Sequence, residues 1–398
     1  MSETVAALPD WPMPRSCPFS PPDAYRELRE EPPVKVAVAG GEAWLVTQYE
    51  HVRQVLGDPA RFSSLDTNPG FPIRIQLPPE PGIMSLVRLD GEEHAKLRRM
   101  VMSEFTVRRT RAMHADIEAL IEGLLDELEA VGPGADLVER FTVRLPALVI
   151  ARMLGVPQQD EFTFAEHSRT IVSSDSTPEQ VYGAFVELSQ YMDRLTTAKE
   201  QDPQEDLLSR LARDHVPTGE LTHQQLVSLS RFLLVAGHET TAHQISLSVL
   251  SLLKDPALLA ELQSDPALYK PAVEELLRYW SIAQDNQVRA AVQDVEVGGA
   301  RIAKGDGVIL AIPGANHDES VFPGAGTLDI QREARHHIAF GFGPHLCPGA
   351  PLARLELELC LRALFTRFPT LRLAVPDSEL EFRHTGLVYG LEKLPVTW

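Results

Sequence analysis

Cysteine is scarce in this chain, with only Cys17, Cys347 and Cys360 among its 398 residues. These three lie far apart in the sequence and form no C-x-x-C pair, which excludes a disulfide framework. Chains without disulfides are typical of reducing compartments. We therefore expect a protein that folds without disulfides in a reducing compartment.

Long apolar runs are also missing. No uncharged apolar stretch approaches the roughly 18 residues that a membrane-spanning helix needs. The first residues, MSETVAALPDWPMPRSCPFSPP, are broken by prolines and lack the basic-then-apolar pattern of a secretory signal. We expect no membrane association and a cytoplasmic location.

Positive charge is in deficit. Lys and Arg number 37 against 56 Asp and Glu, which gives a formal net charge of −19. Nucleic-acid binding needs a basic surface, so this class of function is excluded. An apolar content of 44% is enough for a large core. The length allows two or three domains, or one large enzyme domain.

The apolar pattern predicts a mainly α protein with a minor β region. Its longest helix is expected to begin at the capping box Thr222-His223-Gln224-Gln225 and to end at Asp255-Pro256. At 1.5 Å rise per residue this helix is roughly 48 Å long, so it should cross the core of a single domain over 1–398. Short strands are expected at 34–38, 43–47, 288–297, 300–302, 308–312, 371–375, 380–382 and 387–391, and a Pro- and Gly-rich lid or binding loop at 63–87.

The most informative stretch is FGFGPHLCPGA, from Phe340 to Ala350. It places Cys347 in a glycine-rich turn directly before a predicted helix. Backbone N–H groups at a helix N-terminus favour a thiolate over a thiol. Gly341, Gly343 and Gly349 let the backbone turn and lie close against a flat group. A loop with a free structural thiol is the alternative.

A polar feature interrupts the apolar middle of the long helix, in the run LLVAGHETT over 233–241. A glycine such as Gly237 in the interior of a helix lowers helix stability by about 1 kcal/mol relative to alanine. Its presence therefore indicates a structural or functional requirement. Thr240 can donate a hydrogen bond to the carbonyl of Ala236, which bends helices. With Glu239 alongside, the run predicts a small notch that holds an acid and an alcohol. An ordinary buried helix with a tolerated glycine explains this run equally well.

Two other motifs are excluded by their spacing. HETTAH is similar to the H-E-x-x-H zinc motif, but His238 and His243 are about 140° apart around a helix and cannot share one metal. Gly341-x-Gly343 lacks the third glycine of a dinucleotide fingerprint and opens no βαβ unit.

Two charged pairs have helical spacing. Glu275 and Arg278, at i, i+3, share one helix face, and His94 and Arg98, at i, i+4, can present two cationic donors to one anion. Taken alone, each pair is an ordinary solvated surface contact.

The Phe-Gly-x-Gly-x-His-x-Cys-x-Gly run resembles the haem-ligand loop of the cytochrome P-450 family, and the other motifs occur in family order. The resemblance, to soluble bacterial members, covers nearly the whole chain. It implies the cytochrome P-450 fold with its long central helix, and haem b (iron protoporphyrin IX) bound through the Cys347 thiolate, which pushes electron density to the iron and helps O–O cleavage. The further roles that it implies are proton delivery to dioxygen by Glu239 and Thr240, a structural triad of Glu275, Arg278 and Arg332, and haem contacts from His94, Arg98, Arg289, His345, Phe340, Gly341, Ala236 and Gly349.

The resemblance also implies a monooxygenase that inserts one oxygen atom from O2 into a mid-sized, largely apolar substrate. Electrons would come from NAD(P)H through a separate ferredoxin reductase and ferredoxin. By analogy we expect hydroxylation or epoxidation of a macrolide or other polyketide, by a monomeric enzyme. The residues expected to line the substrate pocket are Phe232, Val235, Ala236, Arg74, Ile282, Asn286, Leu387 and Val388, with Gln284 and Asp285 as further polar groups.

The segment 88–111 carries seven basic and four acidic side chains, a net charge of +3 in a chain of −19. Such a patch would steer an acidic ferredoxin at rates that fall with salt. A solvated helix face is the alternative.

The chain departs from the family pattern at three places, one of which is the glycine-rich FPGAGTLDIQR meander over 322–332. Gly91-Glu92 stands where a proline pair is more usual before His94, and Pro348 follows the ligand where leucine is common. Proline has no N–H, so Pro348 removes the hydrogen-bond donor nearest to the Cys347 sulfur.

Two other classes of haem protein stay open. A peroxide-driven haem–thiolate enzyme usually lacks the acid–alcohol pair, and a non-catalytic haem binder or gas sensor needs neither a lid nor an apolar pocket. A strongly red-shifted Soret band of the reduced, CO-bound protein indicates thiolate ligation. NADH consumption with a ferredoxin pair then separates the monooxygenase from the peroxide-driven enzyme.

Overall fold

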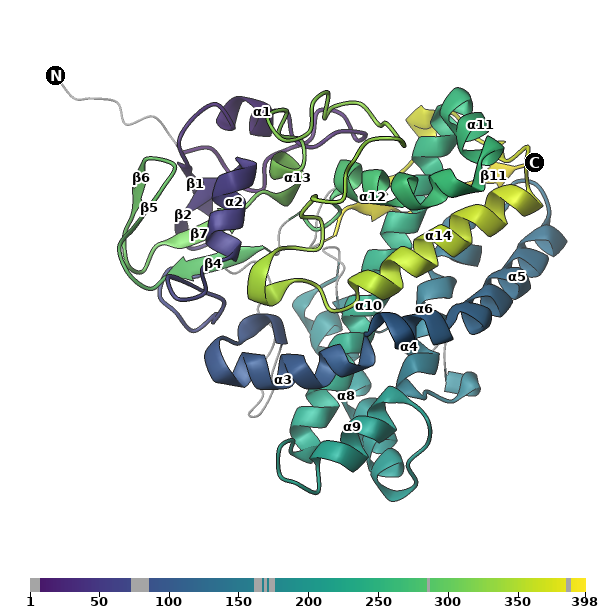
Figure 1. Cartoon of the computed structure of the whole chain (residues 1–398), viewed down its shortest axis with the longest axis horizontal. Helices are drawn as coiled ribbons and strands as arrows, with labels where there is room; N and C mark the ends of the chain where they lie inside the picture. The colour runs from purple at the N-terminus through teal and green to yellow at the C-terminus, as the bar shows by residue number, and fades with distance from the viewer. Residues whose placement is uncertain are drawn as a thin grey trace.

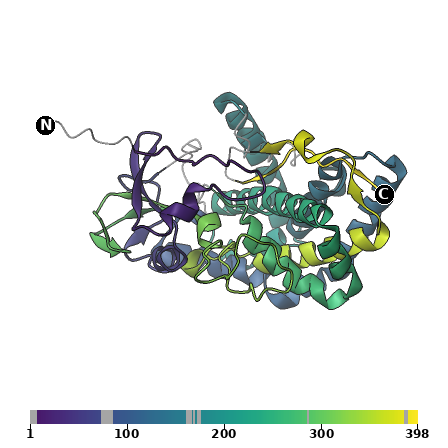
Figure 2. The ribbon, with the colours of Figure 1, turned by 90° about the horizontal axis from the view of Figure 1, so that it is seen from above.

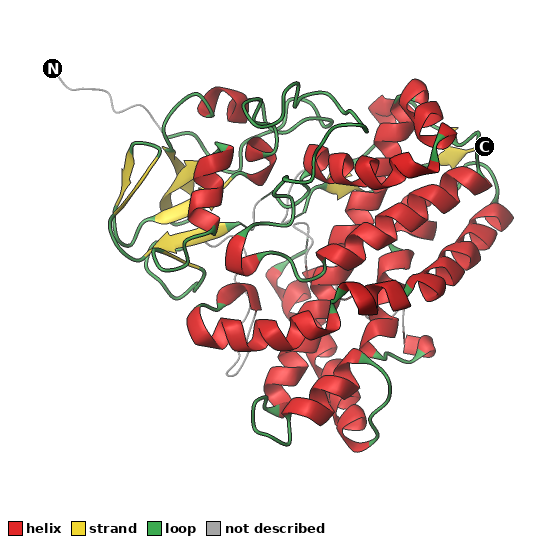
Figure 3. Ribbon diagram, viewed as in Figure 1, coloured by secondary structure: helices red, strands yellow, loops and turns green. Residues whose placement is uncertain are grey.

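The computed structural model describes residues 8–72, 86–160, 167, 170–171, 176–284, 287–383 and 388–398. Helices make up most of the molecule, and the strands near the N-terminus gather at one side (Figure 1, Figure 3). The prediction of a mainly α protein with a minor β region is confirmed.

The helices are α1 (Ala24–Leu28), α2 (Tyr49–Leu56), α3 (Gly91–Glu104), α4 (Val107–Ala112), α5 (His114–Val131), α6 (Arg144–Leu154), α8 (Pro178–Gln201), α9 (Leu207–His215), α10 (His223–Lys254), α11 (Pro256–Ser264), α12 (Tyr269–Trp280), α13 (Ile312–Ala315) and α14 (Ala350–Arg367). The strands are β1 (Val34–Val38), β2 (Gly41–Val46), β3 (Phe62–Ser63), β4 (Val288–Ala291), β5 (Val295–Val297), β6 (Ala300–Ile302), β7 (Gly307–Leu310), β8 (Arg372–Leu373), β9 (Phe382–Arg383), β10 (Gly390–Leu391) and β11 (Val396–Thr397).

The long central helix forms as predicted. The Thr222 hydroxyl accepts a hydrogen bond from the backbone N–H of Gln225, and the Gln225 side chain accepts one from the N–H of Thr222 at 2.9 Å. This reciprocal cap satisfies two donors at the helix start. Most side chains of α10 are buried, and the helix runs through the middle of the helical part in both views (Figure 1, Figure 2).

The main sheet brings together strands from both ends of the chain, in the order β1-β2-β7-β4-β3. The predicted hairpin is present, with Lys35 opposite Trp44 in antiparallel register. Strand β7 then pairs parallel to β2 and antiparallel to β4. The sheet therefore ties the N-terminal segment to the region that precedes the Cys347 loop.

Several strand predictions need correction. The run expected as one strand over 288–297 forms two, β4 and β5, which belong to different sheets. The C-terminal strands are shorter than expected, and β11, which pairs with β8, was not predicted. Of the predicted loop over 63–87, residues 73–85 lie outside the described part of the chain, and Ser63 belongs to β3.

The largest hydrophobic cluster packs around α10 and includes buried side chains of α5, α6, α12 and α14. A second cluster lies between α2 and the main sheet. Among the described helices, none combines the length and apolar character that crossing a membrane requires.

Candidate functional site

The Cys347 loop closes on itself just before α14. The backbone N–H of Cys347 donates a hydrogen bond to the carbonyl of Phe340 at 2.9 Å. Gly341 and Gly343 have φ values of 78° and 71°, a conformation that favours glycine. A Cβ at Gly343 would also lie 2.6 Å from the Leu56 carbonyl oxygen of α2. The predicted glycine-dependent turn is confirmed at these two positions.

Gly349 differs from the expectation, because its φ of −76° is open to any residue. A Cβ there would lie 3.8 Å from Sγ of Cys347, which is ordinary van der Waals contact. The predicted conformational need for glycine is therefore wrong at this position.

The pKa of the Cys347 thiol depends on burial as well as on the position of the thiol before a helix. Burial raises the pKa of the thiol above its ordinary value. Hydrogen bonds from the backbone of Gly349 and Ala350, and the charges of Arg98 and Arg354, lower the pKa but do not outweigh burial. The argument from the helix N-terminus left out one opposing contribution, which is the cost of desolvating the sulfur.

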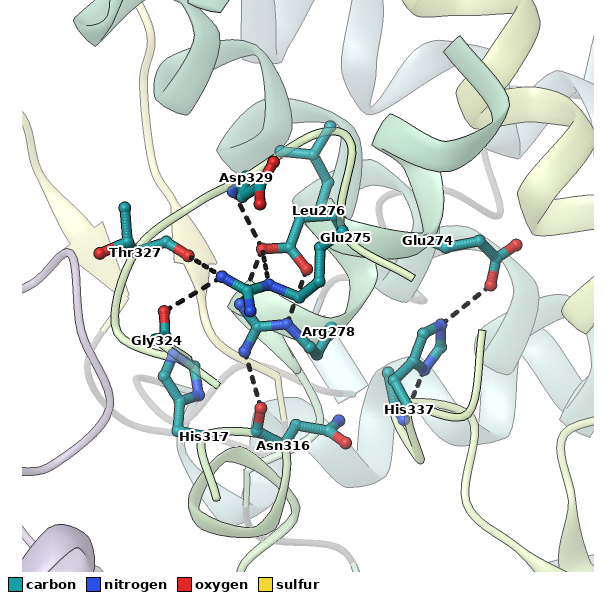
Figure 4. Close-up of polar contacts among 12 residues, drawn as sticks. Glu274, Glu275, Leu276, Arg278, Asn316, His317, Gly324, Thr327, Asp329 and His337 are labelled. Atoms are coloured by element: carbon teal, nitrogen blue, oxygen red, sulfur yellow. Dashed lines mark hydrogen bonds and ion pairs between the residues drawn. The ribbon is translucent and has the colours of Figure 1, made fainter. Parts of the chain in front are cut away.

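The predicted structural triad assembles with no exposure of Glu275 or Arg278. Arg278 donates from Nε and Nη2 to the two Glu275 oxygens at 2.7 and 2.8 Å, and Arg332 donates from Nε at 3.2 Å. Figure 4 shows the Glu275 carboxylate at the centre, with the N–H of Asp329 as a further donor at 3.1 Å. Arg278 also donates to the carbonyl of Asn316 at 2.7 Å. The triad therefore joins α12 to the loops that precede the Cys347 segment.

A second ion network beside the triad was not predicted. Arg354, in the second turn of α14, donates to both oxygens of Glu274 at 2.6 and 3.0 Å. Nε2 of the buried His337 lies 3.2 Å from the same carboxylate (Figure 4). The Arg354 guanidinium lies 4.7 Å from the centre of the Phe340 ring. This network connects α12 and α14 to the start of the Cys347 loop.

The four predicted haem-propionate contacts lie close together. The rings of His94 and His345 stack with their centres 4.0 Å apart. Arg98, on α3 with His94, donates to the carbonyl of Leu346 at 2.6 Å. Arg289 on β4 is buried and donates to the carbonyl of Val288 at 2.7 Å.

The surroundings of His94 oppose the positive charge that was expected there. Burial, then the charges of His345 and Arg98, lower the pKa of His94 to about 4. Its ring is therefore neutral at pH 7 and can donate one N–H. Burial and the neighbouring Arg88 also lower the pKa of Arg289, to about 10, which still leaves it charged.

His345 has partners that the sequence did not reveal. Its Nε2 atom lies 3.1 Å from the Ser64 hydroxyl and 3.5 Å from the Asp90 carboxylate. Burial opposes ionisation of Asp90, but contacts with His345, Ser63 and Ser64 lower its pKa to about 2. The Ser64 backbone N–H donates to Asp90 at 2.9 Å. Asp90 therefore remains an anion that orients His345.

These residues fit a bound haem. Nε2 of His94 is buried and has no hydrogen-bond partner among the described residues. The neighbouring Arg289 is a buried cation and Arg98 is a half-buried one, and a buried cation requires an anionic partner. Two propionates would supply that charge. A single cysteine in a glycine-turned loop next to this basic cluster is the donor set that a haem–thiolate site needs.

One face of α10 is accessible in the middle of the helix. Phe232 and Thr240 are half-buried and Ala236 is exposed, whereas their neighbours Leu233, Leu234 and the residues from 241 to 250 are buried. Positions 232, 236 and 240 are four apart and share one side of the helix. Val235 is half-buried next to this stripe. A bound group or a substrate could contact α10 along this accessible stripe.

The predicted notch in α10 has the expected hydrogen bond but no break in the helix. The Thr240 hydroxyl donates to the carbonyl of Ala236 at 2.8 Å, while α10 stays helical throughout. Gly237 is closely packed, because a Cβ there would lie 3.3 Å from the Ile150 side chain of α6. Glu239 is buried, and its carboxylate contacts His243 and Arg383. The acid and the alcohol thus face different surroundings.

The predicted pocket residues are only partly described. Ala283 and Val388 form an isolated antiparallel bridge, and the N–H of Tyr389 donates to the carbonyl of Ile282 at 2.9 Å. The structure thus places Ile282 and Val388 side by side. Gln284 accepts hydrogen bonds from Arg15. Arg74, Asp285, Asn286 and Leu387 lie outside the described residues.

Some arginines of the basic segment 88–111 make contacts within the protein, and others are exposed. Arg98 holds the Cys347 loop, and Arg109 pairs at 3.5 Å with the buried Glu104. Arg99, Arg108 and Arg111 remain exposed. A surface hollow nearby is lined by Val107, Arg111, Lys270, Pro351, Arg354 and Leu355, among others.

Comparison with known proteins gives concordant results. A family model described as Cytochrome P450 matches residues 267–389. Cytochrome P450-SU2 of Streptomyces griseolus is 45% identical over 389 residues, covering 96% of this chain and 94% of that protein. Vitamin D3 dihydroxylase of Streptomyces griseolus is 44% identical over 98% of this chain and 97% of that protein. The structure of mycinamicin VIII C21 methyl hydroxylase MycCI from Micromonospora griseorubida, bound to mycinamicin VIII, matches with a TM-score of 0.92 and 41% identity, covering 98% of this chain and all of that chain.

Proposed function

Because the chain belongs to the cytochrome P450 family and is a cytochrome P450 monooxygenase, we propose that it inserts one oxygen atom from O2 into a mid-sized, largely apolar substrate by hydroxylation or epoxidation. The observation that carries this proposal is the accessible stripe of Phe232, Ala236 and Thr240 on the otherwise buried α10. A central helix that is open along one face provides the wall of an enclosed reaction space.

The cofactor of the proposal is haem b. Cys347 would ligate its iron, and His94, Arg98, Arg289 and His345 would hold its propionates. Phe340, Gly341 and Gly349 would contact it from the Cys347 loop, and Ala236 from α10. When bound, the haem supplies the chemistry that activates dioxygen. Glu275, Arg278 and Arg332 would keep the loop in place without taking part in the chemistry.

The protein's own contribution to the reaction is proton handling and positioning. The Thr240 hydroxyl, held on the Ala236 carbonyl, lies on the accessible face of α10 and can pass a proton to an oxygen atom there. Glu239 is the neighbouring acid from which that proton would come. The apolar side chains of Phe232 and Val235 would exclude water and orient the substrate.

We assign the substrate to the macrolides or other polyketides. One relative of known structure is named for hydroxylation of mycinamicin VIII and was solved with that compound. The half-buried Phe232 and Val235 together with Ile282 and Val388 offer mostly apolar surface. Arg74, Asn286 and Leu387 complete the proposed set of pocket residues.

Electrons would come from NAD(P)H through ferredoxin reductase and ferredoxin. Arg99, Arg108 and Arg111 are exposed on α3 and α4, and Arg111 also lines the hollow at Val107. A basic rim around an apolar patch suits an acidic partner. We place the enzyme in the cytoplasm as a monomer, with residues 1–398 forming one domain.

Three measurements on the purified enzyme test this proposal. A library of macrolides and other polyketides is screened for a substrate-induced shift of the Soret band. The best binder is then incubated with NADH, ferredoxin and ferredoxin reductase under isotopically labelled dioxygen. The proposal predicts a product that carries one labelled oxygen atom and NADH consumption that depends on ferredoxin. Turnover with peroxide but none with the ferredoxin pair would instead support the peroxide-driven class.

A further inference from the structure

The segment 15–20, which precedes α1, packs against the C-terminal part of the chain. The hydroxyl of Tyr389, the residue before β10, donates a hydrogen bond to the carbonyl of Pro18 at 2.7 Å. The ring of Phe19 meets the ring of Phe382 on β9 edge-on, with the ring centres 5.5 Å apart. The beginning and the end of the sequence are therefore in direct contact at β9 and at the start of β10.

Arg15 connects this contact to the segment that follows α12. The Cζ atom of its guanidinium lies 3.8 Å from the centre of the Tyr389 ring. Its Nε and Nη2 atoms both donate to Oε1 of Gln284, at 3.3 and 3.1 Å, and Nη1 donates to the carbonyl of Ser20. A single half-buried side chain thus joins the N-terminal segment to two parts of the chain that lie far from it in the sequence.

These two parts also pair with each other, and they carry two of the proposed pocket residues. Ala283 and Val388 form the isolated antiparallel bridge, and the N–H of Tyr389 donates to the carbonyl of Ile282 at 2.9 Å. Gln284 is two residues after Ile282, and Tyr389 directly follows Val388. Contacts at Gln284 and Tyr389 therefore act on the spacing between Ile282 and Val388.

The two parts differ in how firmly the rest of the protein holds them. Tyr389 has no exposed surface, and its ring stacks on Trp280 and Phe382 with ring centres 6.2 and 5.9 Å apart. Residues 281–284, all of which the structure describes, form only the isolated bridge, and Gln284 is half-buried. Arg15 therefore ties the less supported part to the firmly packed one.

We propose that Arg15 is a positioning residue that sets the spacing of Ile282 and Val388, and thereby the size of the substrate that the enzyme accepts. The inference rests on the pocket assigned under the proposed function. Arg15 acts through Gln284 and Tyr389 without touching the substrate. A guanidinium suits this double role because it is planar, so that its face packs on an aromatic ring while its edge donates hydrogen bonds.

Three variants of the full, haem-loaded chain separate this role from general stability. Arg15→Met removes the charge and the donors but keeps an unbranched apolar side chain. Arg15→Lys keeps a charge near Tyr389 and loses the planar fork that bonds Gln284. Lys35→Met is the matched control, because Lys35 is another cation near the N-terminus that lies over an aromatic ring, 5.6 Å from the centre of Trp44, in the hairpin of β1 and β2.

The first readout is hydrogen exchange of the Tyr389 backbone N–H, followed by mass spectrometry, and it needs neither turnover nor a ligand. This N–H reports directly on the pairing with Ile282. Arg15→Met should exchange about fivefold faster than the wild type, which corresponds to the loss of roughly one hydrogen bond of support. Arg15→Lys should lie between the two, and Lys35→Met should match the wild type.

The second readout is the affinity for two iron-binding ligands of different size, measured from the shift of the Soret band. Imidazole is too small to span the pocket, whereas clotrimazole is an imidazole that carries three aromatic rings. Arg15→Met should bind imidazole as the wild type does and clotrimazole about fivefold more weakly, because the larger ligand must restore the spacing that Arg15 maintains. Lys35→Met should bind both ligands as the wild type does.

Wild-type exchange and wild-type clotrimazole affinity in Arg15→Met would overturn the proposal. An equal loss of affinity for imidazole and clotrimazole would also overturn it, because such a loss indicates general damage to the haem site. Failure of the proposed function is distinguishable, since the wild type would then show no ferredoxin-dependent turnover while the differences in exchange and affinity stand.

Discussion

Replacing Glu275 with glutamine should destabilise the protein strongly, because it removes the only carboxylate of the triad, in which Glu275 and Arg278 are fully buried. Glu275 accepts hydrogen bonds from Arg278 at 2.7 and 2.8 Å and from Arg332 at 3.2 Å. The glutamine leaves the Arg278 charge buried without an anion. Breaking a buried pair in this way costs about 3–5 kcal/mol.

This cost can be converted to a melting temperature. At about 2.1 cal/mol/K per residue, a chain of this length has an unfolding entropy of about 0.8 kcal/mol/K, so Tm should fall by about 4–6 °C. The matched control is Asp214→Asn, which removes an ion pair of similar length, 2.8 Å to Arg213, between side chains that are each 51% exposed. Exposed pairs contribute roughly 0.2–1 kcal/mol, so the control should shift Tm by about 1 °C or less. Calorimetry of both variants is the assay, and equal shifts would refute the reasoning from burial.

Three further predictions concern the reaction and its partners. Thr240→Ala should raise the peroxide released per NADH about fivefold, the equivalent of one hydrogen bond of about 1 kcal/mol, with haem content unchanged; unchanged coupling would remove Thr240 from the mechanism. Arg99→Glu combined with Arg111→Glu should lower ferredoxin-supported turnover about tenfold at low salt and flatten its salt dependence, and wild-type kinetics in this double variant would place docking elsewhere. Pro348→Leu should add an N–H donor to the Cys347 sulfur, raise the ferric/ferrous potential and shift the ferrous–CO band; a potential that stays constant or falls would contradict this role of the missing donor.

The sequence predicted well those features that depend on residues close together in the chain. The capping box at Thr222 fixed the start of α10 to within a residue, and glycine spacing around Cys347 predicted the turns at Gly341 and Gly343. The i, i+3 spacing of Glu275 and Arg278 predicted their pairing, although its complete burial depended on the loops packed over it.

The remaining features depend on contacts between distant segments. Arg383 meets Glu239 across 144 positions, and His345 meets Ser64 across 281. Neither pairing leaves a trace in local periodicity. The close packing of Gly237 against Ile150 of another helix is also a contact that no argument about one helix can supply. Burial also raises the pKa of the Cys347 thiol and lowers the pKa of His94, and neither effect can be read from local sequence patterns.

The central claim, that Cys347 binds the haem iron as a thiolate, is tested most directly by the absorption spectrum of the reduced, CO-bound protein. The wild type should show the strongly red-shifted Soret band of thiolate ligation. Cys347→Ser should lose that band, whereas Cys17→Ser, at an exposed position, and Cys360→Ser, at a buried one, should keep it. Absence of the band from the wild type, or its persistence in Cys347→Ser, would contradict the account.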